Sequence, residues 1–258
     1  MSHTTAAPAP SPAERIIIAL DVKNKAEALD LVRKLPGARI FKVGLELFTA
    51  EGPALLGELR AAGKKVFLDL KLHDIPNTVA QAVKSGSRHG VHLMTLHASG
   101  GMEMLARAAE AAAEIAAKES SSPPKLLGVT VLTSLKDEEL RQVGFADGVA
   151  AQVLRLAKLA RAAGLDGVVS SAQEITVVRK ETGSGFLIVT PGIRPAWAAA
   201  DDQKRIMTPA EAIRLGADFL VIGRPITQAP SPQEAFDRVM EEIAPPSPGP
   251  GGTSRAEG

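Results

Sequence analysis

The feature of this sequence that most restricts its fold is a unit that recurs along the chain. A helical stretch rich in Ala, Leu and Arg ends at a glycine, and a short apolar run typical of a strand follows within three residues, as in AAGKKVFLDL and RLGADFLVIG. A glycine directly after a helix adopts the left-handed backbone that ends the helix without a steric penalty. Gly37, Gly63 and Gly90 follow one another at intervals of 26 and 27 residues, and Gly164 and Gly216 are 52 residues apart, or twice 26, which indicates one repeating βα unit.

Eight short apolar runs bounded by turn residues predict eight strands. In chain order they are Ile16–Val22, Ile40–Phe48, Lys65–Leu72, His92–Ser99, Leu126–Ser134, Gly167–Ser171, Phe186–Ile193 and Phe219–Ile226. Helical patterns separate them, including Lys25–Leu35, Met102–Lys118, Val149–Ala163 and Pro209–Leu215. Eight such units match the (β/α)8 barrel, or TIM barrel, whose typical size is about 250 residues. We therefore expect a single α/β barrel domain over residues 15–243.

A doubly wound open sheet is the alternative architecture. Its dinucleotide-binding form carries a Gly-x-Gly-x-x-Gly turn directly after the first strand. In this sequence the first apolar run continues into Asp21, Val22 and Lys23 instead. The missing glycine turn favours the barrel.

The two ends of the chain are expected to lie outside the barrel. Residues 1–14 are rich in Ala, Pro, Ser and Thr, lack the cationic start and apolar segment of a secretory signal, and predict a flexible leader. Residues 244–258 combine Pro, Gly and Ser and predict a disordered tail. No apolar run approaches the roughly 20 residues that a membrane helix needs.

The composition excludes several classes of protein. A formal net charge of +1 provides no electrostatic footprint for nucleic acid or for an anionic membrane. The absence of cysteine excludes disulfides, thiolate metal sites and a cysteine nucleophile, and it is typical of a reducing compartment. We therefore expect a cytoplasmic protein whose chemistry uses other side chains.

The densest cluster of charged residues lies at the end of the third predicted strand, in FLDLKLHD. Side chains two residues apart on a strand share a face, so Asp69 and Lys71 are expected to point into the barrel. Lys42 on the neighbouring strand and Asp74 beyond the strand end extend this pair to an alternating array of four charges. A buried ion-pair network that only sets strand register is the alternative. Four alternating charges at the catalytic end of a barrel favour a functional site.

A second group of residues follows the seventh and eighth strands, in TPGIRP and IGRPI. Loops at these positions bind phosphate in many (β/α)8 enzymes, through backbone N–H groups exposed at glycine and through guanidinium groups. Gly192, Arg194, Gly223 and Arg224 supply these parts. A single Gly-Arg-Pro turn is equally compatible with a surface arginine, but two such loops on the expected strands favour a phosphoester ligand.

Other polar residues add to the predicted site. Asp21 ends the first strand, and Thr133 and Ser134 close the fifth. Gln203 lies in the long segment after the seventh strand and is either a contact of a loop that folds over the ligand or part of a solvated helix start. The histidines show no metal-ligand spacing with carboxylates, so no metal site is predicted.

Together these motifs resemble the orotidine 5′-phosphate decarboxylase family, in its bacterial form. The matching segments run in order through residues 16–240 as IALDV, FKVGLELF, FLDLKLHDIPNTV, VLTS, TPGIRP and IGRPI, with Gln203 between the last two. The Asp-x-Lys-x-x-Asp core with two phosphate loops is highly specific, and no motif position departs from the family pattern. The resemblance implies decarboxylation of orotidine 5′-monophosphate to uridine 5′-monophosphate, the last step of pyrimidine nucleotide synthesis, with no metal or organic cofactor.

The resemblance also implies a role for each site residue. Lys71 would protonate C6 of the pyrimidine as carbon dioxide leaves, Asp69 would face the substrate carboxylate, and Lys42 and Asp74 would complete the catalytic array. Substrate contacts are implied for the ribose (Asp21 and Lys42), the pyrimidine edge (Thr133 and Ser134) and the phosphate (Arg194, Gln203, Gly223 and Arg224). Asp74, Ile75 and Thr78 would reach across a homodimer interface into the site of the other subunit.

Two other functions remain compatible with the sequence. One is a magnesium-dependent enzyme similar to 3-keto-gulonate-6-phosphate decarboxylase, whose family shares the Asp-x-Lys-x-x-Asp core but lacks the lysine seen here as Lys42. The other is a non-catalytic barrel that binds a nucleotide and regulates a partner. A non-catalytic barrel is expected to lose part of the charged array. All four members of the array are present in this sequence, which favours an enzyme.

Overall fold

The computed structural model describes residues 10–198 and 207–245, and in them eight parallel strands pair in chain order and close into a barrel. The strands are β1 (Ile16–Ala19), β2 (Ile40–Gly44), β3 (Lys65–Leu72), β4 (Leu93–His97), β5 (Lys125–Val129), β6 (Gly167–Val169), β7 (Leu187–Pro191) and β8 (Phe219–Ile222). β8 closes the barrel by pairing with β1, where Val221 lies opposite Ile17. The predicted single-domain TIM barrel is confirmed, and the open-sheet alternative is excluded.

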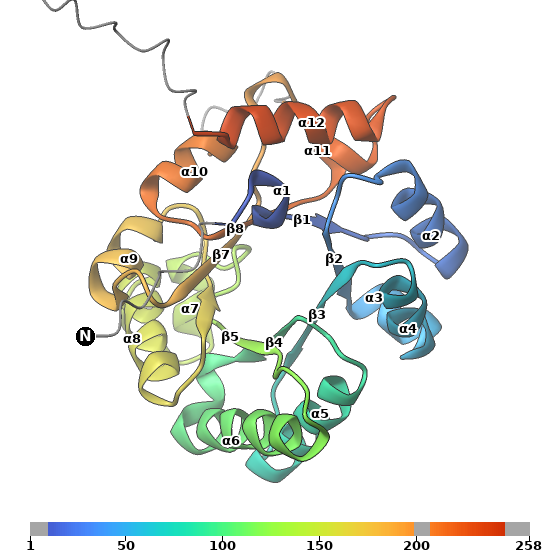
Figure 1. Ribbon diagram of the computed structural model, residues 1–258. Coiled ribbons are helices and arrows are strands. Elements are labelled where there is room, and N and C mark those ends of the chain that lie inside the picture. The colour runs from blue at the N-terminus through green and yellow to red at the C-terminus, as the bar shows by residue number, and fades with distance from the viewer. Residues whose placement is uncertain (1–9, 199–206, 246–258) are drawn as a thin grey trace, which may run out of the picture.

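Helices surround the barrel and cover its outer face (Figure 1). They are α1 (Pro12–Arg15), α2 (Lys25–Lys34), α3 (Leu45–Glu51), α4 (Ala54–Ala61), α5 (Pro76–Arg88), α6 (Gly101–Glu119), α7 (Asp137–Gln142), α8 (Val149–Ala162), α9 (Ile175–Thr182), α10 (Pro209–Leu215), α11 (Arg224–Thr227) and α12 (Pro232–Ile243), with 3-10 turns η1 (Ala98–Gly100) and η2 (Ala196–Ala198). The four helices named from the sequence are found within one residue at each end. None of the helices in the described part of the chain has the length and apolar character needed to cross a membrane.

The alternation of side chains along each strand separates the barrel interior from the layer beneath the helices. Apolar residues such as Ile40 and Phe67 belong to the cluster that fills the barrel, and the intervening residues pack with the helices in a larger cluster. Lys42 and Asp69 occupy the next inward positions on the same two strands. The interior of the barrel is therefore apolar up to Ile40 and Phe67, and charged side chains follow toward the carboxyl ends of the strands.

Four of the five recurring glycines have the predicted left-handed backbone, with φ from 63° at Gly90 to 111° at Gly216. Gly37 lies outside that region, so the prediction is wrong there. Its N–H donates to Gln233 Oε1 at 3.1 Å, and a Cβ at residue 37 would lie 2.8 Å from Gln233 Nε2. The close approach of α12 is the reason that this position suits glycine.

Every predicted strand except Lys65–Leu72 runs past the observed end. β2 ends at Gly44 and β8 ends at Ile222, and a helix begins within two residues of each. The apolar runs continue into these helices because Leu47 of α3 and Ile226 of α11 are also buried. A short apolar run does not distinguish a buried strand from the first turn of a buried helix.

Helix α1 corrects the expected start of the domain. The composition of residues 1–14 predicts a flexible leader, but residues 12–14 belong to a helix whose Ala13 packs against the core. Ser11 and Glu14 form a capping box, and Glu14 lies 3.6 Å from Lys65 Nζ. The short amphipathic turn was missed because the Pro- and Ala-rich composition around it is typical of a leader. The rest of the predicted leader before residue 10 and the tail from residue 246 lie outside the described residues.

Candidate active site

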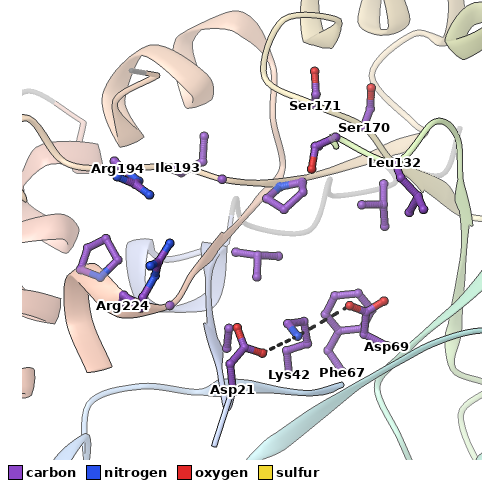
Figure 2. Close-up of a pocket in the computed structure, with 18 of the residues that line it drawn as sticks. Asp21, Lys42, Phe67, Asp69, Leu132, Ser170, Ser171, Ile193, Arg194 and Arg224 are labelled. Carbon is purple, nitrogen blue, oxygen red and sulfur yellow. Dashed lines mark hydrogen bonds and ion pairs between the residues drawn. The ribbon is translucent and has the colours of Figure 1, made fainter. Parts of the chain in front are cut away.

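A cavity of about 600 Å³ opens at the carboxyl ends of the strands. Its walls come from the ends of every strand except β4, so it is the meeting point of segments far apart in the sequence (Figure 2). Its charged lining residues are Asp21, Lys42, Asp69, Lys71, Arg194 and Arg224. All six were predicted site residues, and the structure brings them together.

Lys42 lies between two carboxylates on one side of the cavity (Figure 2). Its Nζ is 3.1 Å from Asp21 Oδ1 and 3.7 Å from Asp69 Oδ2. Lys71 Nζ is 2.9 Å from the same Asp69 oxygen. Asp69 and Lys42 are largely buried, whereas two thirds of the Asp21 side chain is exposed. Asp69 therefore anchors two ammonium groups in a poorly solvated place, where an unpaired charge would be costly.

The end of β3 departs from regular strand geometry at Lys71. Its φ of 52° lies in the left-handed region, which non-glycine residues rarely adopt and which is frequent at functional sites. The Lys71 N–H donates to Thr95 Oγ1 at 2.9 Å, and that hydroxyl donates to Asp69 Oδ1 at 3.0 Å. The predicted inward direction of Asp69 and Lys71 is thus reached through a bulged backbone rather than through simple alternation.

Two histidines stand beside this charged group. His97 ends β4, and its ring lies 5.4 Å from that of His73. Burial, followed by the electrostatic influence of the neighbouring His73 and Lys71, lowers the pKa of His97 below its ordinary value, although Asp69 opposes the shift. The neutral imidazole is therefore favoured near pH 7. The described residues contain no group of three or more His, Asp or Glu side chains arranged to hold a metal ion.

The opposite side of the cavity carries Arg194 and Arg224 (Figure 2). Arg194 follows β7, where its N–H donates to the carbonyl of Met207 at 3.2 Å, and Arg224 is the first residue of α11. Gly192 and Gly223 lie next to these arginines in the lining. The lining holds four cations and two carboxylates, an excess of two positive charges that suits a phosphate monoester, which carries about −1.5 to −2 at pH 7.

Four predicted site residues are not part of this cavity, and one cannot be located. Asp74, Ile75 and Thr78 are exposed around the start of α5, so the cavity of one chain holds three of the four charges of the predicted array. β5 ends at Val129, which leaves Thr133 on the cavity wall but Ser134 exposed outside it. The strand was predicted too long because the run after β5 is also apolar. Gln203 lies outside the described residues.

Sequence reasoning missed four polar residues of the site. Ser170 and Ser171 line the cavity directly after β6, and Gln228 lines it at the end of α11. Thr95 contacts Asp69 from β4. The signal for Thr95 was present, because alternation along β4 places it on the same inward face as Leu93. The two serines follow the strand end directly, which is the position where functional groups of such barrels gather.

The chain is similar to known proteins over nearly its whole described length. Residues 14–239 match the Orotidine 5′-phosphate decarboxylase / HUMPS family. A Synechocystis sp. protein named orotidine 5′-phosphate decarboxylase is 49% identical over 232 residues, covering 90% of this chain and 98% of that protein. A protein of the same name from Geobacter sulfurreducens is 52% identical over 231 residues, covering 89% and 96%. The crystal structure of orotidine 5′-phosphate decarboxylase from Lactobacillus acidophilus matches with a TM-score of 0.80 at 39% identity, covering 88% of this chain and 98% of that one.

Proposed function

The chain belongs to the orotidine 5′-phosphate decarboxylase / HUMPS family and is a decarboxylase, and from that premise we propose that it converts orotidine 5′-monophosphate to uridine 5′-monophosphate and carbon dioxide without a cofactor. One observation carries the proposal: the Asp69–Lys71 pair, with Nζ 2.9 Å from Oδ2, faces the same cavity as Arg194 and Arg224. The cavity volume of about 600 Å³ falls in the range of about 300–1,000 Å³ that small-molecule sites have.

Lys71 supplies the charge and the proton that this reaction needs. When the bond to the carboxylate breaks, its electron pair stays on C6 of the pyrimidine and carbon dioxide leaves. The Lys71 ammonium stabilises the negative charge at C6 and transfers a proton to it, after which Lys71 takes a proton from water. Because this charge develops only as the bond breaks, the interaction raises turnover rather than only tightening substrate binding.

Asp69 faces the substrate carboxylate in this proposal, but repulsion between the two is a limited source of catalysis. Two carboxylates about 4 Å apart repel by roughly 4 kcal/mol at an effective dielectric constant near 20. Enzymes lower barriers by about 8–23 kcal/mol. The larger share is therefore assigned to Lys71, and Asp69 contributes by holding the Lys71 ammonium in place.

Arg194, Gly223 and Arg224 bind the phosphate in the proposed complex, with Gln203 from the segment after β7. Asp21 and Lys42 hold the ribose, and Thr133 lies near the pyrimidine. Phosphate contacts far from C6 accelerate the reaction when their binding energy is used to order the site and exclude water. The arginines therefore affect turnover as well as affinity.

Arg224→Ala is expected to lower kcat/KM for orotidine 5′-monophosphate by about tenfold to a hundredfold, the scale of one lost charge-assisted hydrogen bond. Orotidine without its phosphate should be processed equally slowly by the wild type and by this variant, because the lost contact is absent from both complexes. Steady-state kinetics with both substrates test this, with exposed Arg33→Ala on α2 as the control. An equal loss with the nucleoside would contradict phosphate binding by Arg224.

The active form is proposed to be a homodimer with shared sites. Asp74 and Thr78 are exposed, and Ile75 is 67% exposed although it is a large apolar residue. Asp74 Oδ1 accepts only the neighbouring Ile75 N–H among the described residues. These three residues lie just beyond the end of β3, at the rim of the barrel that holds the cavity. Their exposure just outside the cavity supports the proposal that they complete the site of a second subunit rather than their own.

The magnesium-dependent rival and the binding-only barrel give different results in one assay. Purified protein is mixed with orotidine 5′-monophosphate in excess EDTA, and the ultraviolet spectrum is followed over time. Conversion to the spectrum of uridine 5′-monophosphate supports the proposal. If nothing changes, magnesium and a sugar-phosphate acid are added in place of EDTA: turnover then identifies the rival enzyme, and no turnover identifies a binding-only barrel. Lys42, which the rival family lacks, favours the first outcome.

The same proposal assigns the reaction to the last step of pyrimidine nucleotide synthesis and the protein to the cytoplasm. Complementation of a bacterial strain that requires uracil tests the first assignment. Fractionation of cells that express the full chain tests the second.

A further inference from the structure

A bulge in β3 brings Asp69 and Lys71 opposite a single residue of β4. On either side of it Leu68 pairs with Met94 and Leu72 pairs with Leu96, so the three residues 69–71 face Thr95 alone. A bulge leaves backbone groups without their ladder partners and redirects side chains, and it is frequent beside active sites. Thr95 is fully buried and lies where it can form hydrogen bonds with groups that have lost their strand partners at the bulge.

The Thr95 hydroxyl makes one hydrogen bond to each of these two residues. It accepts the Lys71 N–H at 2.9 Å and lies 3.0 Å from Asp69 Oδ1. A threonine hydroxyl has one proton, and an ionised carboxylate only accepts. The proton of Thr95 therefore points at Asp69, and the oxygen lone pair faces the backbone of Lys71.

We propose that Thr95 is a positioning residue for decarboxylation, which holds the backbone of Lys71 and the carboxylate of Asp69 in the arrangement that the reaction uses. The inference rests on the proposed function, because it concerns the same reaction. Thr95 does not line the cavity. It acts through Lys71 and Asp69, without touching the substrate itself.

The backbone of Lys71 needs such support. Its φ of 52° is unfavourable for a residue with a side chain, and such a conformation persists only where the surroundings hold it. Thr95 Oγ1 receives its N–H in place of a backbone carbonyl of β4. Without the hydroxyl, the chain is free to relax toward a regular strand, and the ammonium group moves with it.

The two oxygens of the Asp69 carboxylate have different partners. Oδ1 accepts from Thr95, which leaves Oδ2 facing Lys71 Nζ at 2.9 Å and Lys42 Nζ at 3.7 Å. Loss of the Oδ1 bond lets the carboxylate turn about its own axis and changes the distances to both ammonium groups. The position of Lys71 is thus set from two directions by one hydroxyl.

Thr190 of β7 provides a matched comparison within the same barrel. It is fully buried like Thr95, but its Oγ1 has no hydrogen-bond partner among the described residues. Replacement of each threonine by the nearly isosteric valine removes one hydroxyl from the barrel. Only at residue 95 does the change break bonds to the proposed catalytic pair.

The test compares Thr95→Val, Thr95→Ser and Thr190→Val in the decarboxylation of orotidine 5′-monophosphate. Thr95→Val is expected to lower kcat by about tenfold to a hundredfold, the scale of lost hydrogen bonds to a charged group, with KM close to the wild-type value. Thr95→Ser, which keeps the hydroxyl, should recover most of kcat, and Thr190→Val should match the wild type. A normal kcat in Thr95→Val, or a serine variant as slow as the valine variant, would overturn the proposal. If Thr95→Val does not fold, Thr95→Ala is expected to show the same loss of kcat.

A second readout does not depend on turnover. Crystal structures of the wild type and of Thr95→Val should show that φ of Lys71 leaves the left-handed region in the variant. An unchanged Lys71 backbone would contradict the positioning role. An inactive wild-type protein whose Lys71 backbone still responds to Thr95→Val would instead reject the proposed function and keep the positioning role.

Discussion

Lys71→Ala is expected to lower the rate of decarboxylation by at least about a thousandfold while the barrel stays folded. Preorganised charged or hydrogen-bonding groups that act on charge developing in a transition state have effects of about this size. Lys71 carries the ammonium that contacts Asp69 at 2.9 Å, and the described cavity lining offers only Lys42 as a second ammonium on that side. Lys42 is already engaged by Asp21 at 3.1 Å, so it does not replace the missing group.

The measurement for Lys71→Ala is kcat under substrate saturation, together with the melting temperature and the affinity for uridine 5′-monophosphate. Lys158→Ala serves as the control, because Lys158 forms an exposed ion pair with Glu181 on the outer helices. The control should keep wild-type kcat. A Lys71→Ala protein with near-normal turnover would remove Lys71 from the proposed mechanism.

Asp74→Ala is expected to lower turnover by about a hundredfold or more, although Asp74 is exposed and does not line the cavity of its own chain. The expectation follows from the proposed homodimer, in which Asp74 completes the charged array of the other subunit, where a preorganised charge has an effect of this size. A matched control is Asp237→Ala on α12, whose Oδ1 accepts from Gln233 away from the cavity. The control should retain wild-type turnover.

A mixture of the Lys71→Ala and Asp74→Ala proteins tests directly whether Asp74 acts in the site of the other subunit. In a heterodimer of Lys71→Ala and Asp74→Ala chains, one site receives both mutations and the other receives none. Random mixing places half of the chains in heterodimers, so the mixture should recover about one quarter of wild-type activity. If mixing restores nothing, although native mass spectrometry shows that heterodimers have formed, Asp74 does not act across the interface.

The barrel was predictable because its repeating βα unit is visible in the sequence. Short apolar runs such as Lys65–Leu72 indicate strands, and glycines such as Gly63 and Gly164 mark the ends of the helices between them. The positions of the functional residues also follow from the strand ends, because the carboxyl ends of all parallel strands lie at one face of the barrel. Asp21, Lys42 and Arg224 were placed at that face on this ground alone, and the structure brings them into one cavity.

What escaped prediction depends on contacts between distant segments. The left-handed backbone of Lys71 follows from the bulge against β4, and no residue of FLDLKLHD signals it. Gly37 was assigned to a helix end by pattern, whereas its reason is the approach of Gln233 from the other end of the chain.

The most direct test of the central claim is to follow the fate of the carboxyl carbon. Orotidine 5′-monophosphate labelled with carbon-13 at its carboxylate is incubated with the protein in deuterium oxide and excess EDTA, and the mixture is observed by nuclear magnetic resonance. The account predicts that the label appears as carbon dioxide and bicarbonate at the rate at which uridine 5′-monophosphate forms, with deuterium at C6. Label that stays on the nucleotide, or is released only after magnesium is added, would contradict it.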